Sequence, residues 1–138
     1  MSEKKRIRAE FRSAVFRRDR YRCAICGKPG RDRQGGSGHE AFHRGIPSES
    51  LVPLDAHHIT DRSEMPNGGY VAENGITLCD DGCHRLAEQF HTSGTAAPGF
   101  SPAELYARIG STHERALEAS SALAELAREP LGLGSLSS

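Results

Sequence analysis

Residues that can bind metal ions are concentrated between Leu54 and His84. This stretch opens with L-D-A-H-H-I-T and closes with E-N-G-I-T-L-C-D-D-G-C-H, so it holds two adjacent histidines, two cysteines and a third histidine. A further pair of cysteines lies upstream in C-A-I-C-G. All the cysteines of the chain therefore fall into two close pairs: Cys23 with Cys26, and Cys79 with Cys83.

The two cysteine pairs predict one structural zinc site. Four thiolates suit tetrahedral Zn²⁺, with Zn–S bonds of about 2.3 Å, and the spacing of both pairs lies within the range that zinc sites tolerate. C-x-x-C also occurs in redox proteins, but no strand–helix–strand pattern surrounds it here. Disulfides, free thiols and a metal other than zinc are the alternatives, and a reducing compartment favours metal over a disulfide. We expect Gly27 to relieve crowding where the backbone folds around the ion.

The adjacent histidines lie in residues 51–59, whose apolar pattern predicts a strand. Successive side chains of a strand point to opposite faces. His57 and His58 could therefore serve different roles, one of them binding a metal ion. The alternative is a pair of surface histidines in a hairpin.

A second strand and a helix are predicted downstream of the histidines. Asn74 and Gly75 form a turn signal before a short strand at 76–78, and Asn74 could simply support that turn. A helix is predicted at 83–91, with His84 in its first turn and Glu88 four residues later on the same face. Two side chains at this spacing can bind one ion together, although Glu88 could also be a solvent-facing charge.

Charge is balanced overall but not along the chain. The 18 basic and 18 acidic residues cancel, yet residues 1–22 hold nine basic groups against three acidic ones, a surplus of +6. Such a surplus favours a polyanionic partner, unless it is only a solvated arm. Residues 7–18 are expected to form a helix with an apolar stripe. The candidates for contact with a polyanion are Arg12, Arg17, Arg18 and Arg20.

Length and composition limit the class of protein. A chain of 138 residues with 36% apolar residues predicts one domain with a thin core, of the kind that metals often supplement. No apolar run reaches the roughly 20 residues that a membrane helix needs, and the basic N-terminus lacks the apolar part of a signal peptide. We therefore expect a cytoplasmic protein without a membrane partner.

The remaining segments are expected to be less informative. The glycine-rich residues 28–50 predict a surface loop in which His39 and His43 are solvated. A capping box at Ser101 predicts a helix that stops at Gly110, and a second helix is expected from about residue 111 to 128. This helical pair is expected to pack on the core or to form a homodimer surface.

Taken together and in order, C-A-I-C-G, D-A-H-H-I, N-G-I-T-L-C and C-H resemble the HNH endonucleases, also called ββα-metal or His-Me finger nucleases. The resemblance covers about residues 21–91. It implies a small α+β fold in which two strands and a helix hold one catalytic divalent cation, beside structural zinc knuckles. Together with the segments described above, the expected organisation is a basic N-terminal helix at 1–22, a nuclease core at 23–92, a C-terminal helical segment at 93–130 and a flexible tail at 131–138.

The resemblance also implies roles for individual residues. His58 matches the general base that activates water, and Asn74 matches the asparagine that orients this base or its loop. His57 and His84 match ligands of the catalytic cation, and Glu88 could complete its shell. The cation would be Mg²⁺, Mn²⁺, Ni²⁺ or Zn²⁺.

The function expected from these matches is metal-dependent hydrolysis of phosphodiester bonds in DNA, and the expected form of the DNA is double-stranded. An origin in a phage or mobile element fits a short chain of this kind. One alternative is a zinc-containing nucleic-acid-binding module that lacks catalysis. Another is a structural zinc domain that joins proteins.

Overall fold

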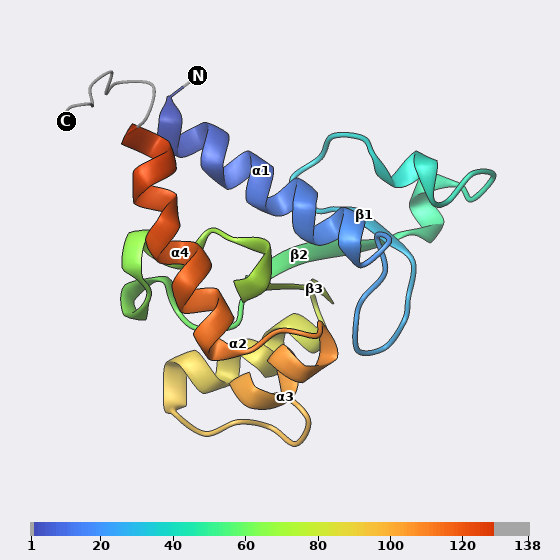
Figure 1. The fold of residues 1–138 in the computed structure, drawn as a ribbon. Helices are drawn as coiled ribbons and strands as arrows, with labels where there is room; N and C mark the ends of the chain where they lie inside the picture. The colour runs from blue at the N-terminus through green and yellow to red at the C-terminus, as the bar shows by residue number, and fades with distance from the viewer. Residues whose placement is uncertain (1, 129–138) are drawn as a thin grey trace.

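A computed structural model describes residues 2–128 as a small α+β fold. Long connections between the main elements contain short 3₁₀ turns. The helices and strands are α1 (Glu3–Arg18), β1 (Gly30–Asp32), β2 (Val52–His58), β3 (Gly75–Cys79), α2 (Cys83–Ser93), α3 (Pro102–Arg108) and α4 (His113–Arg128) (Figure 1). No helix of this part of the chain is both long enough and apolar enough to span a membrane.

The sheet is mixed, in the order β1-β2-β3. β1 runs parallel to β2, and β2 runs antiparallel to β3 with Leu54 opposite Cys79 and His58 opposite Gly75. α1 lies on one side of the sheet, and α2 and α3 lie on the other (Figure 1). The predicted strand at 51–59, the second strand and the following helix are therefore all present, and they are consecutive in the chain.

The predicted N-terminal helix is confirmed, and it begins earlier than expected, at Glu3. The Ser2 side chain caps it by accepting a hydrogen bond from the backbone N–H of Lys5. Its apolar stripe buries Phe11, Val15 and Phe16. The stripe brings α1 against β2 and β3 and so places one face of this helix beside the histidine end of β2.

Gly75 sets how closely α1 approaches the sheet. A Cβ atom at this position would lie 2.5 Å from Val15 Cγ2 and 2.7 Å from Phe11 Cε1. These distances are far shorter than carbon–carbon contacts allow, so only glycine permits the observed packing. The sequence pattern marked Gly75 as a turn residue, whereas the structure uses it as a packing residue.

The expectation of a purely irregular loop at 28–50 is wrong for Gly30–Asp32, which pairs with β2. The local sequence G-R-D carries no strand signal, because glycine and aspartate disfavour strands. The strand forms because the neighbouring backbone is available, and because the missing side chain leaves room: a Cβ on Gly30 would lie 2.4 Å from the carbonyl oxygen of Val52.

His39 and His43 are buried, which corrects the expectation that both are solvated. They are 8% and 4% exposed, respectively. His43 Nε2 lies 2.8 Å from the backbone oxygen of Tyr21, and the His39 ring stands edge-on to the Tyr21 ring. The loop folds back over Tyr21, so that Tyr21 becomes a buried partner for both histidines. The local sequence pattern does not predict this contact.

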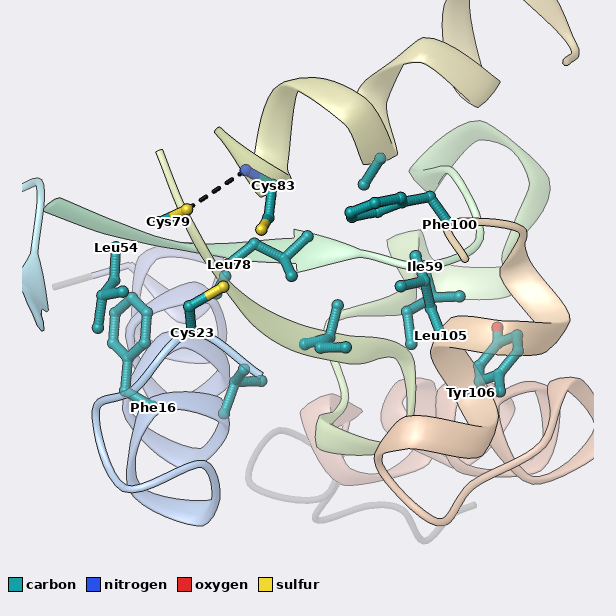
Figure 2. Packing of buried hydrophobic residues seen from close by; sticks show 14 of the residues in the cluster. Phe16, Cys23, Leu54, Ile59, Leu78, Cys79, Cys83, Phe100, Leu105 and Tyr106 are labelled. Carbon is teal, nitrogen blue, oxygen red and sulfur yellow. Dashed lines mark hydrogen bonds between the residues drawn. The ribbon is translucent and has the colours of Figure 1, made fainter. Parts of the chain in front are cut away.

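The hydrophobic core joins the sheet to helices on both sides of it. Figure 2 shows Phe16 of α1, Leu54 and Leu78 of the sheet, and Leu105 of α3 within one buried cluster. The capping box of α3 is present, as predicted, and α4 buries Ala116 and Ser120. The C-terminal helices thus pack on the core, while the tail expected at 131–138 lies outside the described residues.

Replacing Gly75 with alanine should lower the free energy of unfolding by about 1 to 3 kcal/mol, as overpacking of cores usually does. Urea denaturation of the parent and of Gly75→Ala measures this loss. Val15→Ala removes one of the overlapping atoms, so the double variant should lose less stability than the sum of the two single losses. Strict additivity would show that Val15 does not limit the approach of α1.

Candidate functional site

The four cysteine sulfurs converge where β3 meets α2. Their Sγ atoms all lie within 4.8 Å of one another, and Cys26 Sγ is 3.9 Å from Cys79 Sγ. Tetrahedral Zn²⁺ with bonds of about 2.3 Å would place sulfurs about 3.8 Å apart. The thiols form no disulfide. The cluster could therefore hold a metal ion such as zinc.

Each cysteine pair is folded so that a backbone N–H faces a sulfur. The amide of Cys26 approaches Cys23 Sγ at 3.5 Å. The amide of Cys83 approaches Cys79 Sγ at 3.3 Å, the contact marked by the dashed line in Figure 2. Gly27 follows the first pair with φ of +79°, but a Cβ there would meet nothing within 4 Å. Glycine is therefore favoured by the backbone conformation, and the expectation of crowding is wrong.

A second cluster of potential metal ligands lies between β2 and α2. His57 Nδ1 is 3.2 Å from Glu88 Oε2, and His84 Nε2 is 3.4 Å from the same oxygen. The three ligand atoms lie within 4.8 Å of one another. The sequence predicted these three residues as ligands of one cation, and the fold does bring them together.

The protonation states of this cluster suit a cation. Burial lowers the pKa of His57, which favours the neutral imidazole. The neighbouring His57 ring lowers the pKa of Glu88 to about 2, which keeps the carboxylate ionised. Buried His57 Nδ1 forms no well-aligned hydrogen bond despite its closeness to Glu88. An unpaired buried nitrogen beside a carboxylate and a second imidazole fits a metal ligand, because buried polar groups otherwise need partners.

His58 points away from His57, as the extended backbone predicts. Its ring stacks on Phe11 at 4.6 Å between centroids and meets the edge of Tyr70 at 4.7 Å. Burial lowers the pKa of His58 to about 4, so its imidazole is unprotonated at neutral pH. His58 Nε2 has no hydrogen-bond partner within the described part of the chain. Both histidines nevertheless line one hollow of about 550 Å³.

His91 was not among the predicted ligands, and it completes this arrangement. Its ring stacks on His57 at 5.1 Å, and its Nε2 lies 3.0 Å from the backbone oxygen of His58. His91 lies seven residues after His84, close to the same face of α2. That spacing was the available signal, although it cannot show that the ring reaches back to β2.

Asn74 holds the connection that leaves β2. Its side chain is fully buried and forms four hydrogen bonds: two with the backbone of Thr60, one to the Gly69 oxygen and one from the Tyr106 hydroxyl. Thr60 lies two residues after His58. Asn74 therefore supports the loop next to His58, with α3 as its anchor, which is more than the support of a local turn.

Two of the predicted phosphate-contact arginines are used inside the protein. Arg12 binds Asp32 and Asp55 at 2.6 and 2.8 Å, and Arg18 donates to Asp19 and to backbone oxygens. Arg17 and Arg20 are exposed but do not line the hollow of the histidines. The arginines that line it are Arg8, Arg12, Arg33 and Arg62.

Asp55 is the buried carboxylate at which these charges meet. It accepts from Arg12 at 2.8 Å and lies 3.1 Å from Arg33 Nε and 3.5 Å from His84 Nδ1. Burial opposes its ionisation, but the hydrogen bond and charge of Arg12 hold the pKa of Asp55 below its usual value. Because Asp55 faces Nδ1 of His84, Nε2 is left facing Glu88.

Asp55, Asp80 and His84 also lie close enough to suggest a metal site. Two guanidinium groups face these carboxylates, because Arg33 Nε approaches Asp55 at 3.1 Å and Asp80 at 3.6 Å while Arg12 binds Asp55. They would repel a cation at this position. Orientation of His84 is therefore the better explanation for the group.

Cys79→Ser should leave the chain unfolded at 25 °C. Metal binding contributes about 10 to 16 kcal/mol in small zinc sites, which is as large as the whole stability of a typical domain, about 5 to 15 kcal/mol. Zinc content by elemental analysis should be one ion per parent chain, and a chelator should abolish the thermal transition of the parent. A Cys79→Ser variant that melted like the parent would show that the thiols hold no structural metal.

Asn74→Ala should lower the free energy of unfolding by about 2 to 4 kcal/mol, because it leaves buried groups of Thr60 and Gly69 without partners. Tyr106→Phe removes the hydroxyl that donates to Asn74 Oδ1 and lies 2.7 Å from Thr60 Oγ1, but it keeps the contacts of Asn74 with the backbone of Thr60 and Gly69, so it should cost only about 1 to 2 kcal/mol. Denaturant unfolding of both variants makes the comparison. Equal losses would contradict the role of Asn74 as the centre of this network.

The chain was compared with models of protein families, with curated proteins and with solved structures, and none of them matches it.

Proposed function

We propose that this protein is a metal-dependent DNA endonuclease that hydrolyses phosphodiester bonds. The observation that carries the proposal is the hollow shared by a potential metal-ligand cluster and an unprotonated histidine. His57, His84 and Glu88 form the cluster, and His58 lies beside it on the other side of β2. Hydrolysis of a phosphodiester needs both parts, a cation to stabilise charge and a base to activate water.

The ligand set fits a divalent cation. Two imidazoles favour Mn²⁺, Ni²⁺ or Zn²⁺ over Mg²⁺, although Mg²⁺ needs few protein ligands because waters and phosphate oxygens fill its shell. When bound, such an ion would stabilise the negative charge that develops on the phosphate and on the leaving oxygen. Glu88 faces both imidazoles and would offset part of the charge of the ion.

His58 is suited to accept a proton from the attacking water. Its pKa of about 4 makes it a weaker base than a free imidazole, but it is available unprotonated throughout the neutral range. Phe11 and Tyr70 hold the ring, so its orientation does not depend on the substrate. Asn74 acts one step further away, by fixing Thr60 and the loop after β2.

The arrangement of elements supports a ββα-metal core, as the HNH resemblance implies. β2, β3 and α2 follow one another, with His57 and His58 near the end of β2 and His84 in the first turn of α2. Cys79 and Cys83 bracket the junction of β3 and α2, so a zinc ion held there would fix the start of the helix that carries His84.

His58→Ala should reduce cleavage of supercoiled plasmid by at least about 100-fold, the lower end of what a general base contributes. The parent should nick plasmid in Mn²⁺ or Ni²⁺, and in Mg²⁺, but not after removal of divalent ions. The variant should keep its zinc and its affinity for Mn²⁺ because His57, His84 and Glu88 remain.

His113→Ala is the matched control, because His113 is an exposed histidine of α4 that does not line this hollow. It should cut at the parental rate. Undiminished cutting by His58→Ala would refute the role of His58. A parent that holds zinc and binds DNA but cuts in none of these ions would support a non-catalytic nucleic-acid-binding module instead.

A further inference from the structure

The arginines around the hollow of His58 differ in how their charge is used. Arg12 and Arg33 lie against Asp55, and each also approaches a second carboxylate. Arg8 and Arg62 have no carboxylate within ion-pair distance among the side chains that the structure describes. Arg8 and Arg62 are therefore the arginines of this hollow that no described ion pair holds.

Tyr70 holds both of these guanidinium groups. Arg8 Cζ lies 5.2 Å from the centroid of the Tyr70 ring, and Arg62 Nη1 donates to the Tyr70 hydroxyl at 2.6 Å. The same ring meets His58 edge-on at 4.7 Å. The two cations are thus separated from the candidate general base by a single aromatic ring.

A second hollow, of about 620 Å³, adjoins the first at this point. Both are lined by Arg8, Asp61, Arg62 and Tyr70, so they form one continuous surface. Glu3 and Lys4 of α1 and Leu123 of α4 also line the second hollow, and the Glu3 carboxylate pairs with Arg6. The carboxylate of Asp61 at the boundary is turned to the amide and hydroxyl of Ser63, at 3.1 and 2.6 Å.

We propose that Arg8 and Arg62, supported by Tyr70, bind the phosphate next to the scissile one, and that the cleaved DNA strand leaves through the second hollow. This inference rests on the proposed function. Guanidinium groups suit phosphate because they donate paired hydrogen bonds in a fixed plane. The strand would thus contact Arg8 and Arg62, whereas Arg17 and Arg20 would stay outside its path.

The test is binding of a labelled DNA duplex by the full-length zinc-loaded protein. Fluorescence anisotropy, with Ca²⁺ as the only divalent ion, gives the Kd across a series of KCl concentrations. Arg8→Gln/Arg62→Gln should weaken binding at least tenfold, and the slope of log K against log salt should become shallower by about 1.8, at about 0.9 per lost contact. The Kd of Tyr70→Phe should lie between those of the parent and of this double variant.

Two other double variants control for charge. Arg44→Gln/Arg108→Gln removes the same charge from exposed residues that line neither hollow, and it should keep the parental slope. Arg17→Gln/Arg20→Gln tests the competing exposed surface at the C-terminal end of α1 and just beyond it. The inference would be overturned if the slope of log K against log salt became equally shallow in either of these control variants. A parental slope in Arg8→Gln/Arg62→Gln would overturn it as well.

Hydrolysis of bis(4-nitrophenyl) phosphate in Mn²⁺ separates the two proposals, because this diester has no neighbouring phosphate. Arg8→Gln/Arg62→Gln should lose at least about tenfold more of its plasmid cleavage than of its hydrolysis of this diester, whereas His58→Ala should fail on both substrates. An equal loss on the small diester would place the arginines at the scissile phosphate and refute the assignment.

The remaining outcomes also distinguish the proposals. If the parent cleaves plasmid but Arg8→Gln/Arg62→Gln binds DNA with the parental affinity, the nuclease proposal is supported and the proposed phosphate contacts are refuted. DNA binding that depends on both arginines, without cleavage by the parent in any metal ion, would refute the nuclease and support the phosphate contacts alone.

Discussion

The junction between β3 and α2 is the constraint on which the rest of the site depends. Cys79 ends the strand and Cys83 begins the helix, and both sulfurs belong to the four-thiol cluster. A helix that starts at a fixed point presents His84 in its first turn and Glu88 one turn later, toward His57 on β2. A thin core alone would hold this angle weakly. A metal ion at the thiols would fix it by covalent geometry, at the place where an error would move two potential ligands at once.

Asp55 organises the charge around the hollow. A buried carboxylate is costly unless it is paired, and this one lies against two guanidinium groups and one imidazole. This pairing affects both the arginines and His84. Arg12 and Arg33 are occupied, so only other arginines can offer free charge to a polyanion. His84 is also turned so that Nε2 faces Glu88, as expected for a ligand oriented by a carboxylate behind it.

α1 contributes to the site through packing as well as charge. Gly75 lets this helix approach β3 closely, and the approach places Phe11 against the ring of His58. The same contact that fills the core removes water from His58 and lowers its pKa to about 4. Stability and the protonation state of the candidate base therefore have one origin.

The sequence by itself determined the features that depend on neighbours within a few residues. Helical spacing placed His84 and Glu88 on one face, strand alternation separated His57 from His58, and the cysteine spacing indicated a metal cluster. Only the tertiary structure decided which distant groups meet. Arg12 reaches Asp55 across 43 residues of chain, β1 forms only because β2 offers its edge, and His43 finds the backbone of Tyr21. Local spacing shows which side chains share one face of a helix or strand. Contacts between elements depend on how the whole core packs, and a short sequence pattern carries no information about that packing.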